Sequence, residues 1–171
     1  MRTLRKNQSL LKYSNQAAIV PAFETDENGN IKFATYTDED GNEYPFLDEG
    51  GNKVPLFQEY GDLEVLYSEP VPFYGNIALS GGEAESVEYG LSLVDYEAVL
   101  LVERLAVPLT EGALIWFQSK PEYISEDPIH ITVNDKEISG KFAKRTSADF
   151  FVKKIVPSQH FDKYILGAVN K

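Results

Sequence analysis

Histidine is the side chain best suited to proton transfer and metal binding near neutral pH, and this 171-residue chain has it at two positions, His130 and His160. A zinc site needs three or four closely placed ligands, which two distant histidines do not supply. His130 alternates with isoleucines in Pro128–Val133, so we expect it on the solvent face of a strand. No nucleophile-elbow pattern sets a serine at a sharp strand-to-helix turn. The histidines therefore predict no catalytic or metal centre.

Carboxylates gather in three related turns that begin at Asp26, Asp38 and Asp48 and read DENGN, DEDGN and DEGGN. An EF-hand calcium loop needs glycine at its sixth position and flanking helices, whereas glycine is fourth here. Asn-Gly and Asp-Gly supply the positive φ values of tight hairpin turns. Acid/base catalysis by paired carboxylates needs a desolvated pair across a cleft, but glycine-rich turns are solvated. We predict hairpin turns, and calcium binding by these turns stays the alternative.

A glycine- and glutamate-rich loop, Leu79–Gly90, contains the letters LSGGE. These letters match the signature loop of ATP-binding-cassette proteins. Such a domain also needs a GxxxxGK[ST] loop to hold phosphates, and this sequence has none. We therefore interpret Leu79–Gly90 as a flexible loop and expect no nucleotide or other cofactor.

The composition indicates a folded protein that needs no disulfide or thiolate metal site. Hydrophobic residues make up 43% of the chain, and cysteine is absent. No apolar run is long enough to span a membrane, and no apolar core of signal-peptide length follows the basic start Met1–Lys12. The formal net charge of −11 is unevenly distributed, since Glu24–Glu64 is strongly acidic while Met1–Phe23 and Lys141–Lys171 are basic. The acidic middle disfavours sequence-specific nucleic-acid binding and suits complementary contacts between copies.

Hydrophobic alternation and β-branched residues predict an all-β protein with little helix. We expect a small antiparallel β-barrel of about seven strands in a single domain, residues 1–171, with a polar hairpin arm inserted at residues 24–57. Trp116 lies in an apolar stretch and is expected in the core. A short acidic turn is expected at Val94–Glu97. The expected strands are Ala17–Phe23, Leu63–Tyr67, Pro70–Ala78, Ala98–Leu105, Ala113–Ser119, Ile129–Val133, Lys136–Lys144, Phe150–Val156 and Tyr164–Val169.

Four stretches resemble a known family in their order and spacing. These stretches cover about half of the chain: the basic start Met1–Tyr13, the strand and loop Pro70–Gly90, the pair Asp95–Val99 and Ala113–Phe117, and the final strand, turn and strand Ser147–Lys171. The family that they resemble comprises the head–tail connector proteins of long-tailed phages and prophages of Gram-positive bacteria, specifically the head-completion (head-closure, or stopper) proteins.

This resemblance implies a structural, non-enzymatic protein. It implies a homo-oligomeric ring below the portal and adaptor that closes the DNA channel and offers the tail a docking surface. The subunit would be made in the host bacterial cytoplasm and would become part of the virion. It would not contact a membrane, and it would lie near packaged DNA without sequence-specific binding. An isolated subunit could be monomeric.

We expect the interaction residues in three places: the glycine loop, facing the channel or adaptor, the arm, and the basic start. These residues are Ser80, Gly81, Gly82, Glu83, Glu85 and Glu88 in the loop, Asp38, Asp40 and Asp48 in the arm, and Arg2, Arg5 and Lys6 at the start. Two alternatives stay open. One is a tail-completion, tail-terminator or other minor virion protein, and the other is an extracellular β-sandwich module that binds calcium through its Asp/Asn/Gly turns.

Overall fold

The computed structural model describes residues 8–79 and 98–169. Within these ranges the chain is almost entirely β-structure, with one short 3-10 helix, η2 (Arg145–Ser147), and no α-helix. The all-β prediction is therefore confirmed. The strands are β1 (Ser9–Ser14), β2 (Gln16–Pro21), β3 (Thr35–Thr37), β4 (Glu43–Pro45), β5 (Leu63–Tyr67), β6 (Val71–Leu79), β7 (Ala98–Glu103), β8 (Leu114–Trp116), β9 (Ile129–Val133), β10 (Lys136–Gly140), β11 (Phe150–Pro157) and β12 (Phe161–Ala168).

The chain divides into two compact units, each built from segments distant in sequence. The barrel unit consists of Met1–Gln16, Pro70–Glu122 and Lys144–Lys171. The hairpin unit consists of Ala17–Glu69 and Tyr123–Ala143. Residues 24–57, which we expected as an arm of a single domain, thus share a compact unit with other strands.

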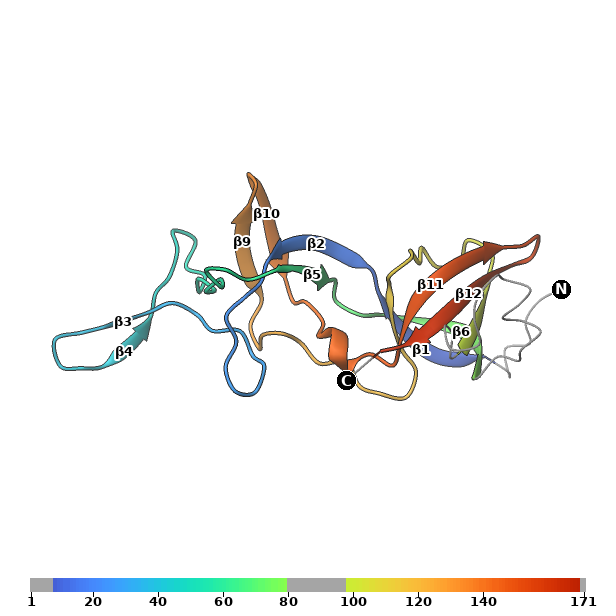
Figure 1. Ribbon diagram of the computed structural model, residues 1–171, viewed down its shortest axis with the longest axis horizontal. Helices are drawn as coiled ribbons and strands as arrows, with labels where there is room; N and C mark the ends of the chain where they lie inside the picture. Colours follow the sequence, from blue (N-terminus) through green and yellow to red (C-terminus); the bar gives the residue numbers. More distant parts are fainter. Residues whose placement is uncertain (1–7, 80–97, 170–171) are drawn as a thin grey trace. The chain divides into compact units, whose positions relative to one another are not determined.

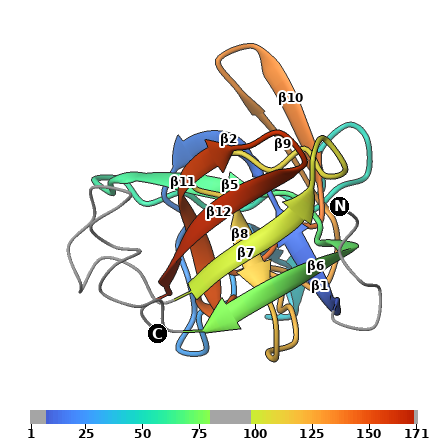
Figure 2. The same ribbon diagram turned by 90° about the vertical axis from the view of Figure 1, so that its right-hand side faces the viewer.

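The barrel unit is a closed antiparallel barrel with the strand order β1-β6-β7-β12-β11-β8, and β1 closes it by pairing with both β6 and β8 (Figure 2). Closure leaves the barrel without a free strand edge. The described barrel contains six strands, close to the seven expected. No strand was predicted at β1, although Leu11 and Tyr13, two residues apart, both point into the core.

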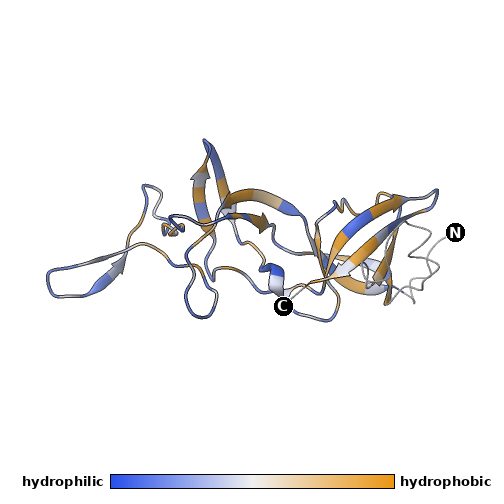
Figure 3. Ribbon diagram, viewed as in Figure 1, coloured by the Kyte–Doolittle hydropathy of each residue, from blue (hydrophilic) through white to orange (hydrophobic). Residues whose placement is uncertain are grey.

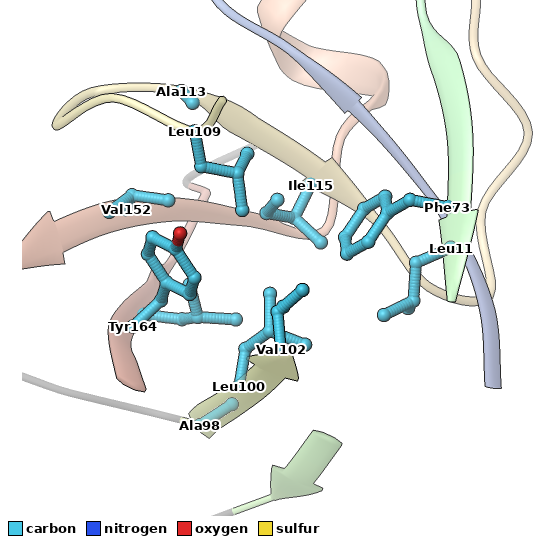
Figure 4. Packing of buried hydrophobic residues seen from close by; sticks show 11 residues of the cluster. Leu11, Phe73, Ala98, Leu100, Val102, Leu109, Ala113, Ile115, Val152 and Tyr164 are labelled. Atoms are coloured by element: carbon cyan, nitrogen blue, oxygen red, sulfur yellow. The ribbon is translucent and has the colours of Figure 1, made fainter. Parts of the chain in front are cut away.

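Side chains from all six barrel strands meet in one apolar core. Leu100 and Ile115 are fully buried there (Figure 4), as is Leu166. The rings of Tyr13 and Phe73 meet edge to face, with centroids 5.6 Å apart. Burial of such side chains supplies the main driving force for folding. Trp116 is also buried, which confirms its predicted place in the core, and its Nε1–H donates to Ser147 Oγ at 3.1 Å.

The hairpin unit has a second apolar core built around Val20, Phe23, Leu66, Ile129 and Phe142. Its regular pairings are short and two-stranded: β2 with β5, β3 with β4, and β9 with β10 (Figure 1). Outside these strands, single antiparallel β-bridges connect further segments of the unit, such as Phe23 with Phe57 and Phe33 with Pro55. The unit is therefore a set of hairpins held on a small core.

Hydropathy differs between the barrel strands and the β3–β4 hairpin. In β11 and β12 hydrophobic stretches are interrupted by hydrophilic residues, whereas the loop between β3 and β4 is hydrophilic (Figure 3). The β3–β4 hairpin has no residue in the apolar core of its unit, and every residue of both strands is exposed.

Candidate interaction surfaces

The three acidic turns have the same geometry. In each, the leading aspartate's Oδ1 accepts the backbone N–H groups of the residues two and four positions later, at 2.8–3.0 Å. The glycines Gly29, Gly41 and Gly51 have φ of 80°, 85° and 78°, a conformation that glycine adopts without a steric penalty. The predicted hairpin turns are confirmed.

These hydrogen bonds also stabilise the charged form of the leading aspartates of two turns. The pKa of the Asp38 carboxyl lies below its ordinary value, chiefly because the backbone N–H of Asn42 donates to it, with help from the side chains of Asn42 and Tyr44. The pKa of Asp48 is lowered in the same way by the N–H of Asn52. In residues 8–79 and 98–169, no group of three or more potential ligand side chains could hold a metal ion.

The β3–β4 hairpin carries an exposed aromatic face. Tyr36 lies opposite Tyr44, with ring centroids 5.6 Å apart, and the backbone N–H of Phe46 donates to Ala34 O at 2.9 Å, which continues the pairing. Alternate residues of paired strands share a face, so Tyr36, Tyr44 and Phe46 lie together. Their exposed fractions are 53%, 42% and 52%. We call these three residues the aromatic face.

The hairpin that carries the aromatic face is also rich in carboxylates. Asp38, Glu39 and Asp40 lie in the loop that joins the two strands, and Glu43 begins β4. The whole hairpin unit contains seventeen Asp and Glu against four Lys and Arg, whereas the barrel unit contains ten against twelve. The excess negative charge of the chain therefore belongs to the hairpin unit alone.

The barrel unit carries a cationic counterpart on β11 and η2. The guanidinium of Arg145 lies 5.6 Å from the centre of the Phe151 ring, and Lys153 Nζ lies 5.9 Å from it. Among the described residues, neither cation is paired with a carboxylate, since the ion pair found there joins Lys53 and Asp127. We call Arg145, Phe151 and Lys153 the cationic patch. It combines two positive charges with a half-buried ring.

Asp149, between η2 and β11, organises the loop after β8. Its Oδ2 accepts the backbone N–H groups of Phe117, Gln118 and Ser119 at 2.8–2.9 Å, and its Oδ1 accepts the Ser119 hydroxyl at 2.5 Å. Burial alone would raise the pKa of this carboxyl, but the bonds from Ser119, Phe117 and Gln118 outweigh burial and hold the pKa below its ordinary value. The carboxylate therefore holds the loop after β8 in place through these hydrogen bonds. Nothing in the sequence singled out Asp149.

The structure separates several of the residues predicted to form sites. Asp38 and Asp40 share the β3–β4 turn, and Asp48 leads the following turn. His130 is half-buried on β9, and His160 is exposed in the connection between β11 and β12. The remaining predicted interaction residues lie outside the described ranges: Arg2, Arg5, Lys6, Ser80, Gly81, Gly82, Glu83, Glu85 and Glu88. The acidic turn expected at Val94–Glu97 also lies outside them.

The barrel unit also has an open hollow of about 710 Å³ near the start of β6 and the end of β7. Phe73, Tyr74, Glu103 and Val107 are among the residues that line it. Glu103 is the one titratable carboxylate in this described lining, so the hollow presents no acid/base pair.

Comparisons of the chain with protein-family models, with curated proteins and with solved structures find no match. A search of the described residues for a helix with the length and apolar character of a membrane span also finds none.

Proposed function

We propose that this chain is a structural virion protein of the phage head–tail interface. In this proposal its copies form a ring below the portal and adaptor, close the DNA channel after packaging, and present a docking surface to the tail. The observation that carries the proposal is the exposed, acidic, aromatic β3–β4 hairpin, held in a unit that accompanies a closed barrel.

Two physical arguments support an assembly role. A closed barrel has no free edge for uncontrolled strand pairing, so it is a suitable rigid body for a ring subunit. The exposed hairpin places aromatic side chains in solvent, and tyrosine and phenylalanine are enriched at protein interfaces. The resemblance of the four sequence stretches to head-completion proteins supplies the particular assembly.

The charge distribution suits a channel component. DNA carries a dense negative charge, so a surface with seventeen carboxylates against four cations repels its backbone. A plug that retains DNA must block the channel without adhering to the phosphates. The acidic hairpin unit meets that requirement wherever it faces the DNA.

The test is co-assembly on the natural template. The purified chain is mixed with DNA-filled, tailless capsids that carry portal and adaptor, and the portal vertex is imaged by electron microscopy while released DNA is measured. A ring at the vertex with retained DNA is expected. Binding to isolated tails and not to capsids would assign the protein to the tail side of the interface. Binding to neither would refute the proposal.

A further inference from the structure

The β3–β4 hairpin lacks the support that two-stranded ribbons normally need. A hairpin without a third strand or a packed face is only marginally stable in water. Here the aromatic face is exposed, and Figure 1 shows no other labelled strand of the hairpin unit along β3 and β4. Three large aromatic side chains on one exposed face indicate a surface that another molecule covers.

Charge identifies the kind of partner. Asp38, Glu39, Asp40 and Glu43 belong to the same hairpin as the aromatic face, and among the described residues no cation forms an ion pair with them. Two such hairpins facing each other would bring eight carboxylates together, which electrostatic repulsion opposes. A symmetric hairpin-to-hairpin contact is therefore disfavoured, and the partner surface must be positive.

The same chain contains a surface of the complementary kind. In the cationic patch, Arg145 and Lys153 hold two like charges beside one Phe151 ring, without a carboxylate partner among the described residues. Asp149 forms no ion pair with either cation, and its oxygens accept four hydrogen bonds from residues 117–119. An incoming carboxylate would relieve the repulsion, and Phe151 offers an apolar contact for a tyrosine or phenylalanine ring.

We propose that the β3–β4 hairpin of one copy docks on the cationic patch of a second copy. The contact pairs two different surfaces, so each copy keeps one free hairpin and one free patch, and repetition generates a closed ring or an open filament. This inference deepens the proposed function and rests on it, because it names the contact between ring subunits.

Site-directed cross-linking tests the contact directly, because the chain has no cysteine of its own. One batch carries Glu43→Cys and a second, with a larger tag, carries Lys153→Cys, so a cross-link between the two sizes joins two chains. We expect this pair to cross-link about tenfold more than a control pair, which corresponds to about 1.4 kcal/mol of preference. The control pair is Glu126→Cys in the hairpin unit with Lys120→Cys in the barrel unit, both at exposed positions. Equal yields from the two pairs would overturn the proposal.

Half-site variants test the head-to-tail arrangement. One variant carries Tyr36→Ser, Glu43→Lys and Phe46→Ser, and the other carries Arg145→Glu and Lys153→Glu. We expect each alone to be monomeric in sedimentation velocity and their mixture to form one-to-one pairs, because the mixture retains one intact hairpin and one intact patch. A mixture that stays monomeric contradicts the proposal, provided that circular dichroism shows both variants folded.

These outcomes separate the inference from the function it rests on. Rings on capsids without the Glu43–Lys153 cross-link would refute this contact and leave the head–tail function in place. Specific cross-linking without capsid binding would support the contact and refute the head–tail function.

Discussion

The two units of this chain differ in how their strands pair and in how much of each unit is exposed. The barrel unit pairs six strands in a closed ring around an apolar core, so these strands leave no free edge. The hairpin unit pairs its strands two at a time and leaves β3 and β4 wholly exposed. The barrel unit is nearly neutral, while the hairpin unit carries all of the excess negative charge. This difference supports the proposal that the barrel is the rigid body of the subunit and the hairpin unit supplies a contact surface.

The largest expected effect tests whether the barrel core provides that rigidity. Leu100 on β7 is fully buried, whereas Leu105, just beyond the strand, is 85% exposed. Leu100→Ala should reduce the free energy of unfolding by about 2–5 kcal/mol, because it removes buried methyl groups and leaves a cavity. Leu105→Ala is the matched control and should change it by less than about 0.5 kcal/mol. Chemical denaturation measures both, and equal effects would contradict the assigned core.

A second prediction concerns the Asp149 hydrogen bonds. Asp149→Asn removes the negative charge of the carboxylate that accepts four hydrogen bonds, and it should destabilise the protein by about 3 kcal/mol. Ser119→Ala, which removes the shortest of these bonds and leaves the carboxylate, should have a smaller effect.

The Asp149 effect should depend on pH with a defined sign. Since folding lowers the pKa of this carboxyl, its contribution is complete above the ordinary value of 3.8 and is lost as the pH falls through the lower folded-state pKa. The stability difference between the native chain and Asp149→Asn should therefore shrink in strong acid. Denaturation curves at pH 7 and at successively lower pH measure it, and a difference that grows on acidification would contradict the assigned role.

The smallest effect compares a glycine from each unit. A Cβ at Gly75 in β6 would lie 2.9 Å from Leu100 Cδ1 and 3.3 Å from Leu101 O, so Gly75→Ala should cost about 1–3 kcal/mol through overpacking. A Cβ at Gly41 would meet nothing within 4 Å, and Gly41→Ala should cost about 1 kcal/mol from its φ of 85° alone. Denaturation detects the first change. Hydrogen exchange should show the second as faster exchange confined to β3 and β4, and exchange that accelerates throughout the barrel would contradict the division.

The local structure followed from residue types and their spacing. The strands β5 and β9 begin and end where the alternation of apolar residues placed them, at Leu63–Tyr67 and Ile129–Val133. The three Asp-led turns were predictable because a short carboxylate and a glycine four residues into the turn favour one hairpin geometry. The burial of Trp116 followed from the apolar residues on both sides of it.

The tertiary structure alone decided which segments meet. β1 was missed as a strand because its partners, β6 and β8, are distant in sequence and its own pattern is short. The Asp149 cluster was equally hidden, since its donors lie thirty residues earlier and only the fold brings them together. The same reason applies to the aromatic face: Tyr36 and Phe46 resemble core residues in sequence, and their exposure depends on whether any other segment packs on them. The sequence by itself determined most of the strands, the turns and the charge of each segment, because these depend on neighbouring residues. The barrel closure, the two units and the exposed hairpin depend on long-range pairing and packing, which local patterns do not encode.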